Sequence, residues 1–181
     1  MRDHVTIAGQ LPAYLGAYVG PKAALAPKLT EAIMLTMNSV DACPYCTGLH
    51  GELARMAGTD DETYASAPVA FARVFAAEAG RGGAVDDALG ELVAAEGAAR
   101  ARSTRALCFA LLWGKTTGNT INAFLSRLRG APKAGSSVFF ELLFFLYYGP
   151  LFLVIAVVNG LLRFFPRVPA WFSAGFGVLL T

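Results

Sequence analysis

The chain has 181 residues and a formal net charge of +2, and hydrophobic residues make up 55% of it. This length suits one domain with a sizeable core, so a single domain over residues 1–181 is expected. The small charge and the lack of a Lys/Arg run exclude nucleic acid as an expected partner. Three cysteines, and no apolar signal-peptide core near Met1, predict an intracellular or organellar protein that is not secreted.

The first hundred residues have the composition of short helices joined by loops. Residues 5–26 are apolar but are interrupted by Gly and Pro, which predicts a loop with a short helix at 14–19. Acidic residues at 60–62 are typical of a helix start, because they suit the positive end of the helix dipole. The longer helices are expected at about residues 28–38, from Ser39 or Asp41 to Met56 with Gly58 as the stop, at 68–79, and from Asp86 to Glu96.

The second half of the chain becomes steadily more apolar. Residues 100–113 predict a helix that Gly114 and Gly118 break, and residues 121–128 predict an amphipathic helix. A linker at 131–135 follows. No stretch alternates apolar and polar residues as a half-buried strand would, so the fold class is predicted to be all-α.

Residues 138–181 form an unusually apolar C-terminal region, expected to fold as a pair or trio of helices. Residues 142–162 carry no charge and are long enough to be a transmembrane candidate. Gly149-Pro150 interrupts this stretch, which favours two short helices hinged there. A helix that is apolar all round is buried in protein or in lipid. The alternatives are burial in an oligomer interface, or contact with a membrane or a membrane-bound complex.

The most distinctive motif is Cys43-Pro-Tyr-Cys46-Thr-Gly-Leu-His50. On a helix, Cys43 and Cys46 are three residues apart, and Cys46 and His50 are four apart, so all three share one face. The nucleophilic form of cysteine is the thiolate, which a helix N-terminus and an adjacent base both favour. A second cysteine within reach converts a sulfenic acid to a disulfide. The spacing therefore favours a redox-active dithiol.

Three other interpretations of this motif stay open. Cysteine is often buried, so the motif could be a pair of small core residues beside a core histidine. A closed zinc site needs four ligands, and only Cys108 and His4 remain, although a catalytic zinc with three ligands and water has the same spacing. A thiol relay without a substrate of its own is the third. No metal or cofactor is expected.

Glu31 precedes Cys43 by twelve residues, and this acid, the dithiol and His50 together resemble a known family. The pattern is similar to the AhpD-like alkylhydroperoxidases of the carboxymuconolactone decarboxylase superfamily. The specific part of the resemblance covers residues 27–58, including the lead-in Pro-Lys-Leu-Thr-Glu-Ala-Ile and the flank His-Gly-Glu-Leu-Ala. The resemblance implies an all-helical domain that forms a homo-oligomer, a trimer or larger.

The resemblance also implies a role for each site residue. Cys46 would attack the peroxide, Cys43 would resolve the product as a disulfide, His50 would take the proton from Cys46, and Glu31 would polarise His50. A dithiol reductant protein would restore the thiols. A histidine often found between the cysteines is replaced by Tyr45, which can donate a hydrogen bond but is no neutral-pH base, so its role would be auxiliary.

These observations predict a thiol-dependent peroxidase or thiol-disulfide oxidoreductase. One alternative is an accessory subunit of a larger, membrane-bound complex that keeps the fold and packs through residues 138–181. The other is a carboxymuconolactone decarboxylase-like lyase, which is the weaker family interpretation because that branch generally lacks the paired cysteines. Core packing is expected for Cys108, which lies in an apolar stretch.

Overall fold

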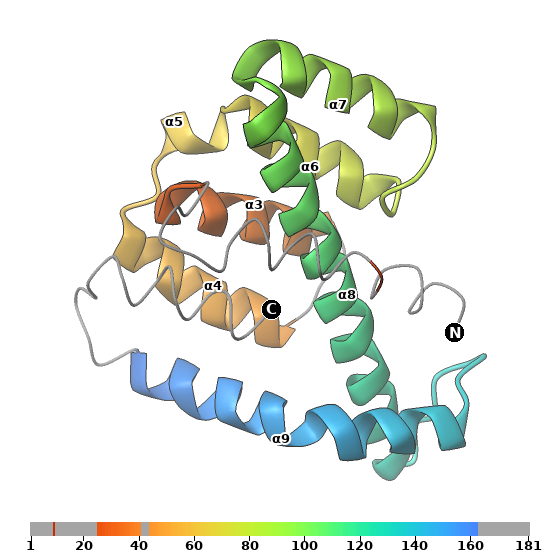
Figure 1. Cartoon of the computed structure of the whole chain (residues 1–181). Coiled ribbons are helices and arrows are strands. Elements are labelled where there is room, and N and C mark those ends of the chain that lie inside the picture. The colour runs from red at the N-terminus through yellow and green to blue at the C-terminus, as the bar shows by residue number, and fades with distance from the viewer. Residues whose placement is uncertain (1–8, 10–24, 41–43, 163–181) are drawn as a thin grey trace.

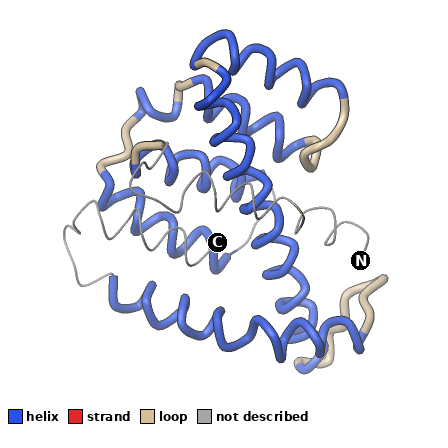
Figure 2. Tube along the Cα trace, viewed as in Figure 1, coloured by secondary structure: helices blue, strands red, loops and turns tan. Residues whose placement is uncertain are grey.

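The computed structural model describes Gly9 and residues 25–40 and 44–162, and every regular element in these residues is an α-helix (Figures 1 and 2). The all-α prediction is therefore confirmed for the described part of the chain. The helix expected at 14–19 and the last part of the apolar C-terminal region, residues 163–181, lie outside the described residues. The helices are α3 (Pro27–Val40), α4 (Pro44–Ala57), α5 (Asp61–Tyr64), α6 (Ala67–Ala77), α7 (Gly83–Glu96), α8 (Ala98–Leu128) and α9 (Val138–Leu162).

Helix α3 lies at the centre and packs against α4, α5, α6 and α8 (Figure 1). Its apolar residues Ile33 and Met34 are fully buried, as are Phe71 and Phe75 of α6. The Phe75 ring and the Phe109 ring of α8 pack nearly at right angles, with their centroids 4.9 Å apart. Burying side chains of this size contributes about 1.5–3 kcal/mol each, so this cluster is a main source of stability.

Helices α4 and α5 end and begin where the sequence predicts. Gly58 follows α4 with φ of +71°, and the N–H of Thr59 donates to the carbonyl of Ala54 at 3.1 Å. This left-handed glycine stop satisfies a carbonyl of the last turn. At α5, the Asp60 carboxylate accepts from the backbone N–H of Thr63 at 2.8 Å. Hydrogen bonds from Thr63 lower the pKa of Asp60 to about 2.

The expected break at Gly114 and Gly118 is wrong, because α8 runs through both glycines. Glycine costs about 1 kcal/mol in a helix interior. Buried apolar residues lie on either side of the pair, among them Leu111 and Ile121. The helix gains more from burying this face than the glycines cost, so one long helix forms where two were expected.

The expected hinge at Gly149-Pro150 is also wrong, because α9 is one helix through Pro150. A proline inside a helix removes one backbone hydrogen bond and costs about 3 kcal/mol. Helix α9 packs against both α8 and α4. Just before the proline, the Tyr148 ring meets Trp113 of α8 at a centroid distance of 5.1 Å. Packing on two neighbouring helices offsets the lost hydrogen bond and holds the helix together.

An ion pair joins α8 to α9 near the start of α9. Arg127 donates from Nε to Oε2 of Glu141 at 2.8 Å and from a terminal guanidinium nitrogen to Oε1 at 3.2 Å. The Glu141 side chain is buried, and the Arg127 hydrogen bonds hold the pKa of Glu141 below its ordinary value. The pair ties the end of α8 to the start of α9 across the loop at residues 129–137.

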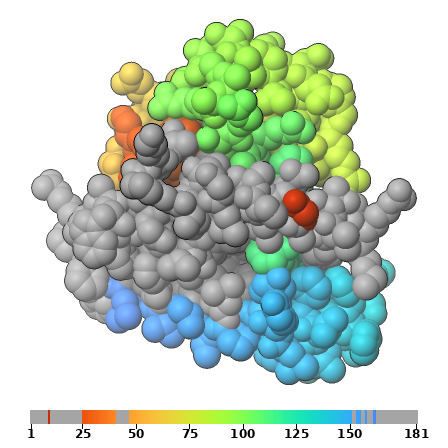
Figure 3. Space-filling model, viewed as in Figure 1, coloured from red at the N-terminus to blue at the C-terminus, as the bar shows by residue number. Residues whose placement is uncertain are grey.

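In the stretches that the structure describes, no helix combines the length and the apolar character that crossing a bilayer requires. Figure 3 shows α9 along the lower edge of the molecule, and several of its large apolar side chains are exposed.

Candidate functional site

The acid and the histidine that the sequence predicts as a pair meet in the structure. Nδ1 of His50 lies 2.8 Å from Oε2 of Glu31, within hydrogen-bond distance. Both side chains are almost fully buried, with 3% of His50 and 1% of Glu31 exposed. A carboxylate and an imidazole are rarely buried without a partner, and here each is the other's partner.

The pairing follows from the way α3 and α4 pack. The two helices are joined by residues 41–43 alone and run antiparallel side by side (Figure 1). Glu31 lies in the second turn of α3 and His50 in the second turn of α4. Nineteen positions separate the two in sequence, and the packing of α3 on α4 brings their side chains together.

Two further contacts hold the start of α3 against the end of α4. The hydroxyl of Thr59 donates to the backbone carbonyl of Lys28 at 3.2 Å. The Lys28 ammonium lies 3.3 Å from the carboxylate of Asp60. Both contacts are exposed, so each contributes little energy, but together they anchor the first turn of α3, next to the turn that carries Glu31.

The dithiol part of the predicted site is described only in part. Cys43 lies outside the described residues. Tyr45 and Cys46 are described as backbone positions in the first turn of α4, and their side chains are outside the description. The helical backbone places Cys46 on the same face as His50, four residues before it. Whether the thiols and the imidazole touch therefore stays a prediction.

Two polar residues on α3 and α5 were not predicted from the sequence. Burial, and then the charge of Glu31, raise the pKa of the Tyr64 hydroxyl, so Tyr64 of α5 lies within electrostatic reach of the acid. Asn38 of α3 is buried, with 5% of its surface exposed, although asparagine prefers the surface. A spacing of seven residues from Glu31 was the sequence signal that could have found Asn38.

The third cysteine belongs to the core. Cys108 is fully buried in α8, and burial raises the pKa of its thiol far above the usual range. A thiol that does not ionise is a poor nucleophile, so the prediction that Cys108 packs in the core is confirmed.

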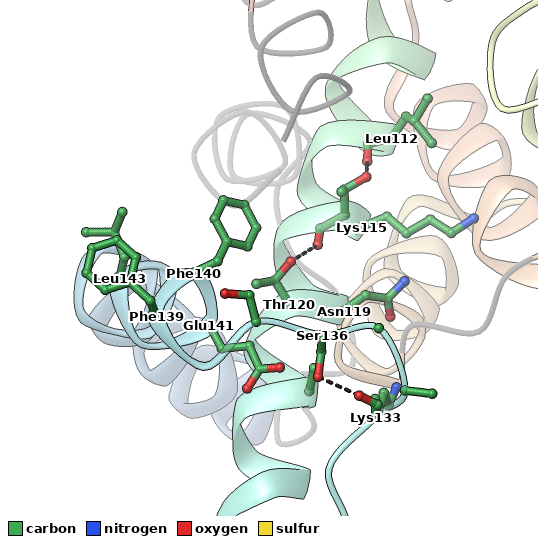
Figure 4. A pocket seen from close by; sticks show the side chains of 15 residues that line it. Leu112, Lys115, Asn119, Thr120, Lys133, Ser136, Phe139, Phe140, Glu141 and Leu143 are labelled. Atoms are coloured by element: carbon green, nitrogen blue, oxygen red, sulfur yellow. Dashed lines mark hydrogen bonds between the residues drawn. The ribbon is translucent and has the colours of Figure 1, made fainter.

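Elsewhere in the described residues a groove is present, and no metal cluster is found among them. Among these residues, no three His, Cys, Asp or Glu side chains gather as a metal site would require. A groove of about 710 Å³ opens between α8, the 129–137 loop and the start of α9, and is lined by Asn119, Thr120, Ser136 and Phe139 among others (Figure 4). None of its lining residues comes from α3 or α4, so this groove is separate from the Glu31–His50 pair.

The chain matches no protein-family model, and comparison with curated proteins and with solved structures likewise found no significant match. The resemblance of residues 27–58 to AhpD-like proteins therefore stays a prediction from the motif.

Proposed function

We propose that the chain is a thiol-dependent peroxidase or thiol-disulfide oxidoreductase whose reaction centre lies at the α3–α4 contact. The observation that carries the proposal is the buried hydrogen bond between His50 and Glu31. His50 lies on the helix that also carries Cys46 and would be the base, and Glu31 would orient it. Nucleophilic catalysis by cysteine needs these two partners.

In this proposal each ring nitrogen of His50 has its own role. An ionised carboxylate can only accept, so with Glu31 ionised the Nδ1–H of His50 donates to it. The lone pair then lies on Nε2, which is the atom that exchanges a proton. Histidine is the side chain used most often as a general base. The buried hydrogen bond holds the ring in one tautomer and one orientation.

The proposed cycle has three balanced steps. The Cys46 thiolate attacks the terminal oxygen of a hydroperoxide, an S–O bond forms as the O–O bond breaks, and the alkoxide leaves with the proton from His50 as an alcohol. The Cys43 thiol then attacks the sulfur of the sulfenic acid, and a disulfide and water form. A dithiol reductant finally exchanges with the disulfide, restores both thiols and is itself oxidised to a disulfide.

Peroxide consumption in the presence of dithiothreitol tests this proposal. The wild type should consume hydrogen peroxide or an organic hydroperoxide, and Cys46→Ser should abolish the reaction. Cys108→Ala is the matched control, because it removes a thiol that the core already keeps unreactive. Equal rates for the wild type and Cys46→Ser would exclude the mechanism.

A second candidate function is favoured by a separate observation on α9. One face of this helix exposes large apolar side chains over its whole length, at Val138, Phe139, Leu142, Leu143, Leu146, Tyr147, Leu153, Val154, Val157 and Leu161. Exposed apolar patches of this extent are typical of surfaces that other molecules cover. This face supports the homo-oligomer that the family resemblance implies, and also a role as an accessory subunit of a larger, membrane-bound complex.

Sedimentation in buffer without detergent separates these two roles. A discrete homo-oligomer that Leu146→Glu dissociates would assign α9 to self-association. Recovery of the chain only with the membrane fraction would instead support the accessory role. A stable monomer that stays in the supernatant would contradict both. No observation on the described residues separately favours the lyase interpretation.

A further inference from the structure

The groove between α8 and α9 has the size of a small-molecule site. Its volume is about 710 Å³, and pockets that bind small molecules usually measure about 300–1,000 Å³. Its wall comes from residues 112–123 of α8, residues 133–137 and the first turns of α9. Helices α3 and α4, which carry the Glu31–His50 pair, contribute no residue to it. The groove is therefore a candidate site that the proposed thiol chemistry does not use.

The wall of the groove is divided into a polar part and an apolar part (Figure 4). In this view Lys115, Asn119 and Lys133 lie on one side, and Phe139, Phe140 and Leu143 lie on the other. The polar residues come from α8 and the loop before α9, whereas these apolar residues all come from α9. Apolar walls with a few polar groups that fix orientation are typical of ligand sites. This division suits a molecule with a polar head and an apolar tail.

The polar part of the groove favours a negative head group. Lys115 and Lys133 line it, and Glu141 is the one acid among its described lining residues. Arg127 donates to both carboxylate oxygens of Glu141, at 2.8 Å and 3.2 Å, so the charge of that acid is offset within the fold. Lys133 is exposed, and its ammonium is therefore accessible to a ligand that arrives from solvent.

The loop at the polar part is held by its own hydrogen bonds. The Ser136 hydroxyl donates to the carbonyl of Lys133 at 2.6 Å, a bond drawn in Figure 4, and accepts from Arg127 at 2.8 Å. Where α9 begins, the backbone N–H of Glu141 donates to the carbonyl of Ser137 at 2.9 Å. Because these contacts already order the loop, a ligand loses less free energy to ordering it on binding.

The apolar part of the groove continues into the exposed face of α9. Phe139 is 78% exposed and Leu143 is 51% exposed, although both line the groove. Leu146, which follows Leu143 by three residues on the same helix, is 67% exposed. Covering such side chains with a hydrocarbon chain removes apolar area from water, which favours binding in proportion to that area. An acyl chain with its head at the polar part has an apolar surface to lie on.

We propose that this groove binds a long-chain fatty acid, with its carboxylate beside Lys133 and its acyl chain against Phe139 and Leu143. The accessible ammonium of Lys133 matches a head group with a single negative charge. The guanidinium of Arg127, whose fork of donors would suit a phosphate, is already bound to Glu141. This binding function goes beyond the proposed thiol chemistry, because it needs neither Cys46 nor His50.

Displacement of cis-parinaric acid, a fluorescent long-chain fatty acid, tests the proposal on the full chain at physiological ionic strength. The wild type should bind the probe saturably at one site per chain, and oleate should displace it. Oleyl alcohol has the same hydrocarbon chain without the charge, so it should displace the probe only at about tenfold higher concentration. Absence of saturable binding, or equal displacement by oleate and oleyl alcohol, would overturn the proposal.

Two pairs of variants locate the ligand in the groove. Lys133→Glu should weaken oleate binding about tenfold, whereas Arg129→Glu, with the same change of charge outside the groove lining, should leave the affinity unchanged. Phe139→Ala should also weaken binding about tenfold. Its control is Tyr147→Ala, at a 75% exposed position of the same helix outside the lining. All four positions are exposed, so the variants should fold, and equal effects within either pair would contradict the assignment.

Vesicles of phosphatidylglycerol separate a fatty-acid site from a general lipid surface. The proposal predicts that excess vesicles do not pull the chain down on sedimentation, while oleate below its micelle concentration still binds. Sedimentation with the vesicles that Phe139→Ala and Tyr147→Ala weaken equally, together with no binding of free oleate, would replace the groove by a membrane contact along α9. None of these measurements uses peroxide, so their outcome is independent of the proposed peroxidase function.

Discussion

Nδ1 of His50 lies 2.8 Å from Oε2 of Glu31, and this buried contact ties α4 to α3 at the centre of the molecule. The pair has two consequences that can be measured separately. It contributes to stability, because removal of either partner leaves a buried polar group unsatisfied. In the proposed mechanism it also orients the base, so its loss should lower the rate of the thiol reaction.

Glu31→Gln separates these two consequences. The glutamine carbonyl can still accept from His50 Nδ1–H, so the free energy of unfolding should fall by no more than about 1 kcal/mol. The negative charge that stabilises the protonated imidazole is lost, and the rate of peroxide consumption should fall on the order of a hundredfold. Urea unfolding and peroxide assays on the same preparation check both values. Full activity in Glu31→Gln would show that the acid is only structural.

The ion pair between Arg127 and Glu141 should make stability depend on pH in the acidic range. The pKa of Glu141 is lowered from 4.5 in the folded chain, chiefly by hydrogen bonds from Arg127. Because the pKa of Glu141 is lower in the folded chain than in the unfolded chain, its ionised form adds to the free energy of unfolding. This contribution is complete above about pH 4.5 and is lost as the pH falls through the folded pKa.

Unfolding midpoints of the wild type and Glu141→Gln between pH 3 and pH 7 measure this effect. The gap between the two should be widest at neutral pH and should narrow as the pH falls below about 4.5. Glu91→Gln, at an exposed position on α7, is the control and should show no such gap. A gap that is constant across this pH range would contradict a pH-dependent contribution from the Arg127–Glu141 pair.

The cap of α5 should behave in the same way, in a lower pH window. Asp60 accepts from the Thr63 backbone N–H, and its pKa is lowered from 3.8 to about 2. The stability that Asp60→Ala removes should be complete above pH 4 and should disappear as the pH approaches 2. Thermal unfolding of Asp60→Ala and the exposed neighbour variant Asp61→Ala checks this, and equal losses from the two would contradict the cap.

Gly80 should be intolerant of any side chain. Its φ is +73°, and a Cβ there would lie 2.6 Å from Cζ of the buried Phe75 ring. Gly80→Ala should lower the free energy of unfolding by about 2 kcal/mol or more, because the strained backbone and the displaced ring both contribute. Gly82 has φ of +92°, and a Cβ there would meet no atom within 4 Å, so Gly82→Ala should cost only the backbone part, about 1 kcal/mol. Equal losses of unfolding free energy in the two variants would show that the Phe75 ring moves aside without cost.

Local sequence signals predicted the helices and several of their ends. The left-handed Gly58 and the Asp60 cap act within one turn, so they could be identified from neighbouring residues alone. The long helices α8 and α9 could not be predicted in the same way. Whether Gly118 or Pro150 breaks a helix depends on the energy gained by packing on distant helices, which no local pattern contains.

The candidate site, too, could be predicted from the sequence only in part. The spacing of Glu31, Cys46 and His50 predicted that these residues work together, and the structure brings Glu31 and His50 into contact. Asn38 escaped prediction, because a lone asparagine in a helix is normally exposed. Only the packing of α3 on α4 shows that its amide is buried without a partner among the described residues.

The central claim is tested most directly by treating the folded chain with one equivalent of peroxide. The free thiols are then counted after denaturation, and compared with those of the untreated chain. The chain has three cysteines. The account predicts three thiols before treatment and one afterwards, with Cys108 as the survivor and a disulfide between Cys43 and Cys46 in the peptide map. Replacing either Cys43 or Cys46 with serine should prevent formation of this disulfide. Three free thiols after treatment of the wild type would contradict the account.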